Sequence, residues 1–125
     1  RCYDSAEKNK KVLLCAFNRR FDSRIRTAIA QVRENEARGS RVHRGLVISR
    51  DAPYPEHRFL GLSGGIFHDC AVHDIDVLNW AFQELPSTVS VTGNYVLDEE
   101  RSGANMDKLC LDNAIIVLTT PSGRT

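Results

Sequence analysis

The sequence predicts a chain that begins as α/β and continues as α+β, with a mostly antiparallel open sheet in its second part. Residues 12–17 are an unbroken apolar run after a helix-like stretch, which is typical of a strand buried on both faces of a parallel sheet. Residues 41–50 alternate between apolar and polar side chains instead, as a half-buried antiparallel strand does. This change of pattern predicts a domain boundary near residue 18, with domains at 1–17 and 18–125.

The first half of the chain also carries two helix patterns. Residues 1–9 suit the end of a helix. Asp22 or Ser23 can cap a second helix, which Gly39 ends. The apolar stripe of this second helix follows spacings of four and three residues, at Ile25, Ile29 and Val32.

The second half of the chain predicts a loop, a helix and two strands. Residues 51–65 are rich in proline and glycine and lie between well-patterned elements, which favours a functional loop over a linker. Residues 66–83 have the strongest helical pattern in the sequence, and Pro86 stops it. Residues 87–97 and 110–120 follow as strands.

The composition excludes several classes of function. The chain has 125 residues, with 17 Lys and Arg against 16 Asp and Glu, so no nucleic-acid footprint is expected. No stretch approaches the roughly 20 apolar residues that span a bilayer. The four cysteines are scattered and form no CxxC pair, which favours a reduced, cytoplasmic protein. We expect no membrane partner.

Both ends of the sequence read as interrupted elements. Arg1 falls inside a helix pattern with no capping residue before it, and residues 121–125 form a turn after a strand with no second strand to follow. The sequence therefore predicts an internal fragment of a longer protein, incomplete at its C-terminus.

The candidate chemistry lies in the helix predicted at 66–83. Asp69 and His73 are four residues apart, so on an α-helix they share a face and can touch, with Asp76 on the same stripe. A carboxylate beside an imidazole fixes its tautomer and raises its basicity, which suits a general acid/base. Because most of this helix is apolar, a polar stripe on it favours a site lining.

Three alternatives compete with an acid/base pair. The stripe is also compatible with a solvated helix face, on which Asp–His pairs are common. A metal site would need His57 or His68 beside the stripe, and no HExxH or cysteine ligand set is present, so no metal is predicted. Ser63 and Cys70 are the nearby nucleophiles, but neither lies in a GxSxG-like turn. Cys70 is expected as a core thiol.

Three segments resemble a known family. They are VLLCAFNRRFD at 12–22, ISRD at 48–51 and SGGIFHDCAVHDIDVLNW at 63–80. Together they are similar to the Gfo/Idh/MocA oxidoreductases, most closely to the inositol 2-dehydrogenase branch. The resemblance implies the end of a Rossmann nucleotide-binding domain over 1–17 and a truncated substrate domain over 18–125. It also implies a small-molecule polyol or sugar substrate, and assembly of identical subunits through the open sheet.

The resemblance implies roles for particular residues. His73 would take the proton from the substrate hydroxyl while hydride leaves the same carbon for NAD or NADP, and Asp69 would orient both. Asn18, Arg19 and Asp51 would contact the substrate, and Arg19 would also lie beside the nicotinamide. Arg20, Arg24 and Arg26 are expected on a solvated face instead.

The sequence also departs from the family pattern. It contains no glycine-rich GxGxxG turn and no Glu-Lys-Pro segment with the catalytic lysine, so the main cofactor site is expected outside this chain. The isolated chain is therefore expected to be inactive. A non-catalytic relative, acting as a binding or structural subunit, is the alternative to an enzyme.

Overall fold

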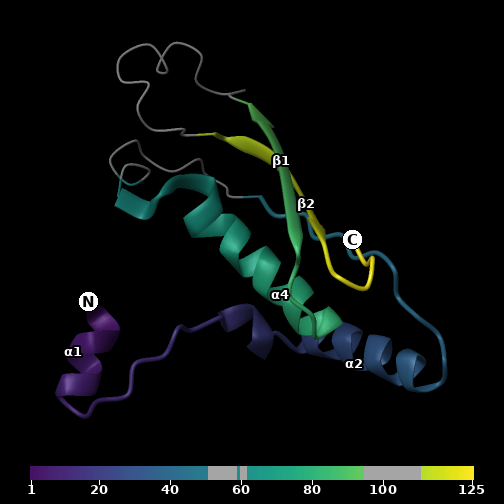
Figure 1. The fold of residues 1–125 in the computed structure, drawn as a ribbon, viewed down its shortest axis with the longest axis horizontal. Coiled ribbons are helices and arrows are strands. Elements are labelled where there is room, and N and C mark those ends of the chain that lie inside the picture. Colours follow the sequence, from purple (N-terminus) through teal and green to yellow (C-terminus); the bar gives the residue numbers. More distant parts are fainter. Residues whose placement is uncertain (51–58, 60–61, 95–110) are drawn as a thin grey trace.

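The computed structural model describes residues 1–50, 59, 62–94 and 111–125, and arranges them as helices beside one two-stranded sheet (Figure 1). The helical elements are α1 (Cys2–Lys8), the 3-10 helix η1 (Asn18–Phe21), α2 (Ser23–Ala37), the π-helical turn η2 (Phe67–Ala71) and α4 (Val72–Phe82). The strands are β1 (Thr88–Asn94) and β2 (Asn113–Thr119). Both η1 and α2 contact α4, whereas α1 stands apart from them in Figure 1.

The structure confirms the two helices predicted before residue 40. α1 lies within the predicted range 1–9, and α2 begins directly after Asp22. The Asp22 carboxylate accepts hydrogen bonds from the backbone N–H groups of Arg24, at 2.8 Å, and Ile25, at 3.4 Å. These bonds favour the charged form and hold the pKa of Asp22 below its ordinary value. After α2, Gly39 adopts φ +90°, the left-handed conformation that commonly ends helices.

The predicted antiparallel sheet forms over the described residues. β1 and β2 pair from Thr88 opposite Thr119 to Asn94 opposite Asn113, inside the ranges predicted as strands. Burial alternates along β2, where Ile116 is half-buried and Ile115 is 66% exposed. Alternation of this kind is expected of a strand with one covered face, and α4 lies along that side of the sheet (Figure 1).

Two other predicted strands do not form. Residues 12–17 have no regular secondary structure, and Val12 is 88% exposed, because no described strand lies beside them to complete a ladder. Residues 41–50 are also irregular. Within the described chain, the Gly45 N–H donates to the Thr125 carbonyl and the Thr125 N–H donates to the His43 carbonyl, both at 2.9 Å. These residues therefore pair with a single residue, Thr125, and not with a neighbouring strand. The predictions of a buried strand at 12–17 and an antiparallel strand at 41–50 are therefore wrong for this structure.

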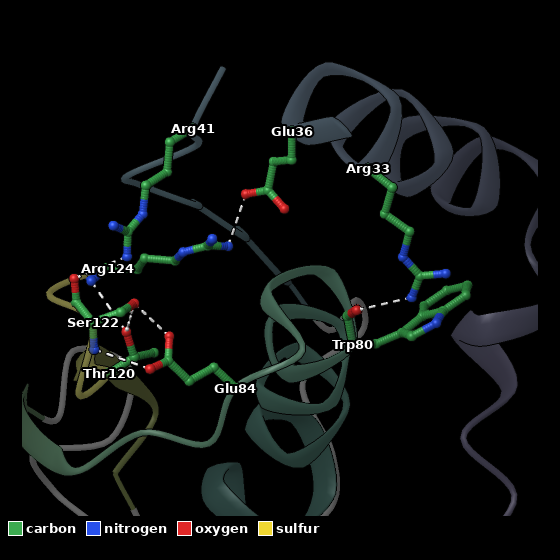
Figure 2. A network of polar contacts seen from close by, with 8 residues as sticks. All are labelled: Arg33, Glu36, Arg41, Trp80, Glu84, Thr120, Ser122 and Arg124. Carbon is green, nitrogen blue, oxygen red and sulfur yellow. Dashed lines mark hydrogen bonds and ion pairs between the residues drawn. The ribbon is translucent and has the colours of Figure 1, made fainter. Parts of the chain in front are cut away.

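A polar network attaches the last residues to the helices (Figure 2). Glu84 accepts hydrogen bonds from the Ser122 hydroxyl and from its backbone N–H, at 2.9 Å, and these bonds lower the pKa of Glu84. The guanidinium of Arg124 forms an ion pair with Glu36 of α2 at 2.9 Å, although the atoms are poorly aligned for a hydrogen bond. The same guanidinium lies over the Phe82 ring of α4. The network compensates for a thin core, since Ile29, Ala71 and Leu111 are the buried apolar residues of the described chain.

Gly93 gives a test of the β1–β2 register. A methyl group there would lie 2.8 Å from the carbonyl oxygen of Asn113 and 2.6 Å from Leu111 Cδ1. Because the first atom is backbone, Gly93→Ala should lower the free energy of unfolding by about 1–3 kcal/mol, measured by urea denaturation. The exposed control Ser90→Ala should change it by less than about 0.5 kcal/mol. Equal stability of the two variants would contradict the register.

The Asp22 cap predicts a dependence of stability on pH. Its folded pKa is depressed, so its charge stabilises the fold above the unfolded pKa of about 3.9. That contribution should disappear as the pH falls through the lower folded pKa. Asp22→Asn keeps the acceptor but removes the charge, so its unfolding midpoint should fall less than that of the wild type between pH 7 and pH 2. Identical pH profiles would refute the assignment.

Candidate functional site

A π-helical turn begins the helix that carries the predicted acid/base residues. η2 precedes α4, and before it Gly64 and Gly65 adopt φ +84° and +72°. Gly64 also has no room for a side chain, because a Cβ atom would lie 2.9 Å from His68 Nδ1. The prediction of one α-helix over 66–83 is thus right for α4 and wrong for the first turn. Single π-turns inside helices are frequent at functional sites.

The predicted contact between Asp69 and His73 does not form. Asp69 lies within η2, and a π-turn closes its hydrogen bonds over five residues instead of four. His73 Nδ1 is buried without a hydrogen-bond partner among the described residues.

Asp69 and His73 nevertheless line the same pocket, together with Arg19. This open pocket has a volume of about 630 Å³ and lies where η1, the segment before residue 51 and η2 meet. Its lining also includes Ile48, Ser49, Arg50 and Cys70. The structure thus brings together three of the five site residues that the sequence predicts, and the predicted core thiol is a neighbour of the site.

Phe17 contributes to the placement of His73. The ring of Phe17 meets the imidazole edge-on, with centroids 6.2 Å apart and an angle of 82° between the ring planes. Edge-to-face pairs of this geometry are favourable. The last residue of the apolar run 12–17 therefore packs against the predicted acid/base instead of lying in a sheet.

Arg20 and Asp76 form an ion pair that differs from the sequence prediction. Two nitrogens of the Arg20 guanidinium donate to the two Asp76 oxygens, at 2.8 and 2.6 Å, and Asp76 is 8% exposed. The hydrogen bonds to Asp76 raise the pKa of Arg20, although desolvation opposes them. Asp76 was expected on the stripe of His73 and instead fastens η1 to α4. Arg20 is exposed, as expected, and pairs with it. The reason is that a buried carboxylate needs a partner.

Asp74 was not predicted as a site residue, yet it contacts one. It forms an ion pair with Arg19 and accepts a hydrogen bond from the Ser49 hydroxyl at 2.6 Å. Ser49 also accepts a bond from Arg19 at 3.1 Å. Two consecutive arginines and two aspartates spaced two apart were visible in the sequence, but their pairing depends on how η1 meets α4.

Of the two remaining predicted site residues, one does not line the pocket and the other is not among the described residues. Asn18 begins η1, is exposed and does not line the pocket, whereas Asp51 lies outside the described residues. No group of three or more His, Cys, Asp or Glu side chains in the described part of the chain is placed to hold a metal ion. Within the same residues, no helix has the length and apolar character to cross a membrane.

Comparison with known proteins gives a consistent picture. Residues 25–125 match the model of the GFO/IDH/MocA C-terminal domain. The chain is 32% identical to myo-inositol 2-dehydrogenase of Thermotoga maritima and 30% identical to inositol 2-dehydrogenase of Rhizobium meliloti. Each alignment covers 98% of this chain. It resembles the crystal structure of a myo-inositol dehydrogenase from Corynebacterium glutamicum, with a TM-score of 0.74 and 29% identity over 87% of this chain and 31% of the other.

The resemblance inferred from the motifs is therefore confirmed. The chain spans about a third of the length of the curated relatives that it matches, namely 35% and 36%.

The Arg20–Asp76 pair predicts an ordered series of stabilities. Arg20→Ala leaves Asp76 buried without its partner, and Arg20→Lys restores the charge but not the two parallel bonds. We expect the thermal unfolding midpoint to fall in the order wild type, Arg20→Lys, Arg20→Ala. Arg26→Ala, on the exposed face of α2, is the control and should match the wild type. Equal midpoints for all four proteins would show that the pair does not anchor η1.

Proposed function

Because the chain belongs to the GFO/IDH/MocA family, we propose that the protein is an oxidoreductase that oxidises a secondary alcohol of a cyclitol or sugar. Two relatives named as inositol dehydrogenases support this class of substrate. The observation that carries the proposal is the pocket shared by Arg19, Asp69 and His73. It places an imidazole, a carboxylate and a guanidinium around one space large enough for a six-carbon polyol.

His73 is proposed as the acid/base of the reaction. Oxidation of a secondary alcohol removes a proton from oxygen and a hydride from carbon, and leaves a ketone. His73 would take the proton, since imidazole is the group that enzymes use most often for this task. Asp69 would accept a hydrogen bond from a substrate hydroxyl and so orient the reacting carbon. Because Asp69 and His73 line the same pocket, a bound substrate would contact both.

NAD or NADP is the proposed cofactor, and when bound it would accept the hydride. The residues of this chain would contact only part of such a cofactor. Arg19 at the pocket wall is proposed to contact it, and the sequence contains no glycine-rich turn for the pyrophosphate. We therefore assign the main dinucleotide site to another part of the protein.

We further propose that residues 1–17 are the tail of a Rossmann domain and that 18–125 belong to the substrate domain. The match of 25–125 to a C-terminal domain and the one-third coverage of the relatives support this division. Asn18 and Asp51 are proposed to contact the substrate. Exposed apolar side chains on β2, namely Ile115 at 66% and Val117 at 46%, support assembly of identical subunits through the open sheet.

Replacement of His73 tests the proposed function. In the whole protein, His73→Ala should lower kcat for NAD(P)-linked oxidation of myo-inositol by about 10²–10⁴-fold, because the proton loses its acceptor. Cofactor affinity, measured by titration of fluorescence, should not change. The control is His43→Ala, which alters an exposed histidine outside the pocket lining. Full turnover in His73→Ala would contradict the role of His73, and a wild-type protein without turnover on any polyol would favour a non-catalytic subunit.

A further inference from the structure

The guanidinium of Arg19 is hydrogen-bonded to Asp74 and Ser49, two residues that the proposed reaction does not use. Its guanidinium Nη1 donates to Asp74 and, at 3.1 Å, to the Ser49 hydroxyl, which in turn donates to Asp74 at 2.6 Å. The hydroxyl therefore uses its one proton toward the carboxylate and a lone pair toward the guanidinium. The three side chains form a closed triangle with each donor matched to an acceptor.

The triangle joins three parts of the chain at the wall of the pocket. Arg19 comes from η1, Ser49 from the segment before residue 51 and Asp74 from α4. Arg19 and Ser49 line the pocket of Asp69 and His73. Asp74 does not line it; it lines a neighbouring cavity of about 310 Å³ between α4, residues 45–49 and β2, which shares Ser49 with the pocket. Asp74 therefore acts on the pocket through Arg19 and Ser49.

The neighbouring Arg20–Asp76 ion pair shows that the Arg19–Asp74 pair is not needed merely to attach η1 to α4. Arg20 already attaches η1 to α4 through Asp76, and neither of these residues lines the pocket. The Arg19–Asp74 pair joins the same two elements a second time. What distinguishes it is that its guanidinium borders the space beside Asp69 and His73, with side-chain exposures of 30% for Arg19 and 19% for Asp74.

We propose that Asp74 and Ser49 are positioning residues that fix the guanidinium of Arg19 at the pocket, where its other N–H groups bind a substrate hydroxyl. The inference rests on the proposed function, because it takes the pocket as the substrate site. A long arginine side chain samples many rotamers, and two bonds to one nitrogen orient the planar fork before the substrate arrives. Asp74 neutralises the charge of the Arg19 guanidinium, and the second hydrogen bond, to Ser49, fixes its orientation.

A double-mutant cycle on the whole protein tests this inference, with myo-inositol and NAD as the probes. Asp74→Asn should lower kcat/KM by roughly tenfold to a hundredfold, mainly through KM, because a misplaced group binds substrate poorly. In an Arg19→Ala background the same change should have little further effect. Asp74→Glu should recover part of the loss, and Ser49→Ala should give a smaller one. Losses of equal size in both backgrounds would overturn the proposal.

The matched control removes a carboxylate from an ion pair elsewhere. Glu34 and Arg38 form an exposed pair at 2.6 Å along α2, so Glu34→Gln should leave kcat, KM and the unfolding midpoint unchanged. If Asp74→Asn fails to fold, Ser49→Ala in the two Arg19 backgrounds provides the same cycle.

A second readout does not depend on turnover. In the wild type, hindered rotation of the Arg19 guanidinium should give separate Nη signals in ¹⁵N NMR spectra, and Asp74→Asn should merge them. A freely rotating Arg19 in the wild type overturns the positioning role whether or not the protein is an enzyme. Absence of turnover together with a restrained Arg19 overturns the proposed function while supporting the positioning role.

Discussion

The arrangement of the site depends on the ion pair between Arg20 and Asp76. A carboxylate that is 8% exposed is costly to bury alone, and the paired bonds at 2.6 and 2.8 Å offset that cost. The pair fixes the end of η1 on α4, and the guanidinium also lies 5.8 Å from the rings of Phe17 and Trp80. With η1 fixed in this way, Phe17 meets His73 and Arg19 reaches the pocket. Few apolar contacts are available to do the same, because the described core is small.

The π-turn η2 carries Asp69 and leads into α4, which carries His73. A regular α-helix would align Asp69 with His73 and allow them to pair with each other. In the structure His73 Nδ1 has no hydrogen-bond partner among the described residues, and both side chains border the pocket. Glycines at φ +84° and +72° make this entry into the helix possible. The proposed acid/base His73 and the proposed orienting carboxylate Asp69 both face the space where a ligand would bind.

The sequence predicted local structure better than it predicted contacts. α1, α2, α4 and the β1–β2 pair follow from periodicity, capping and alternation, which are properties of neighbouring residues. Residues 12–17 and 41–50 have strand-like patterns, but a strand also needs a partner, and the described chain offers 41–50 only Thr125 and 12–17 none. Asp69, His73 and Arg19 were identified from motifs. The pairing of Arg19 with Asp74 and of Arg20 with Asp76 was not, because it depends on how two distant elements pack.

The central claim is that the pocket of Arg19, Asp69 and His73 binds the substrate. Long-range ¹H–¹⁵N spectra of the histidine rings, recorded during a titration with myo-inositol, test it most directly. We expect the ring signals of His73 to shift to saturation while those of the exposed His43 stay in place. Saturable binding that shifts other resonances and leaves the His73 ring unchanged would contradict the account, because the substrate would then occupy a different part of the protein.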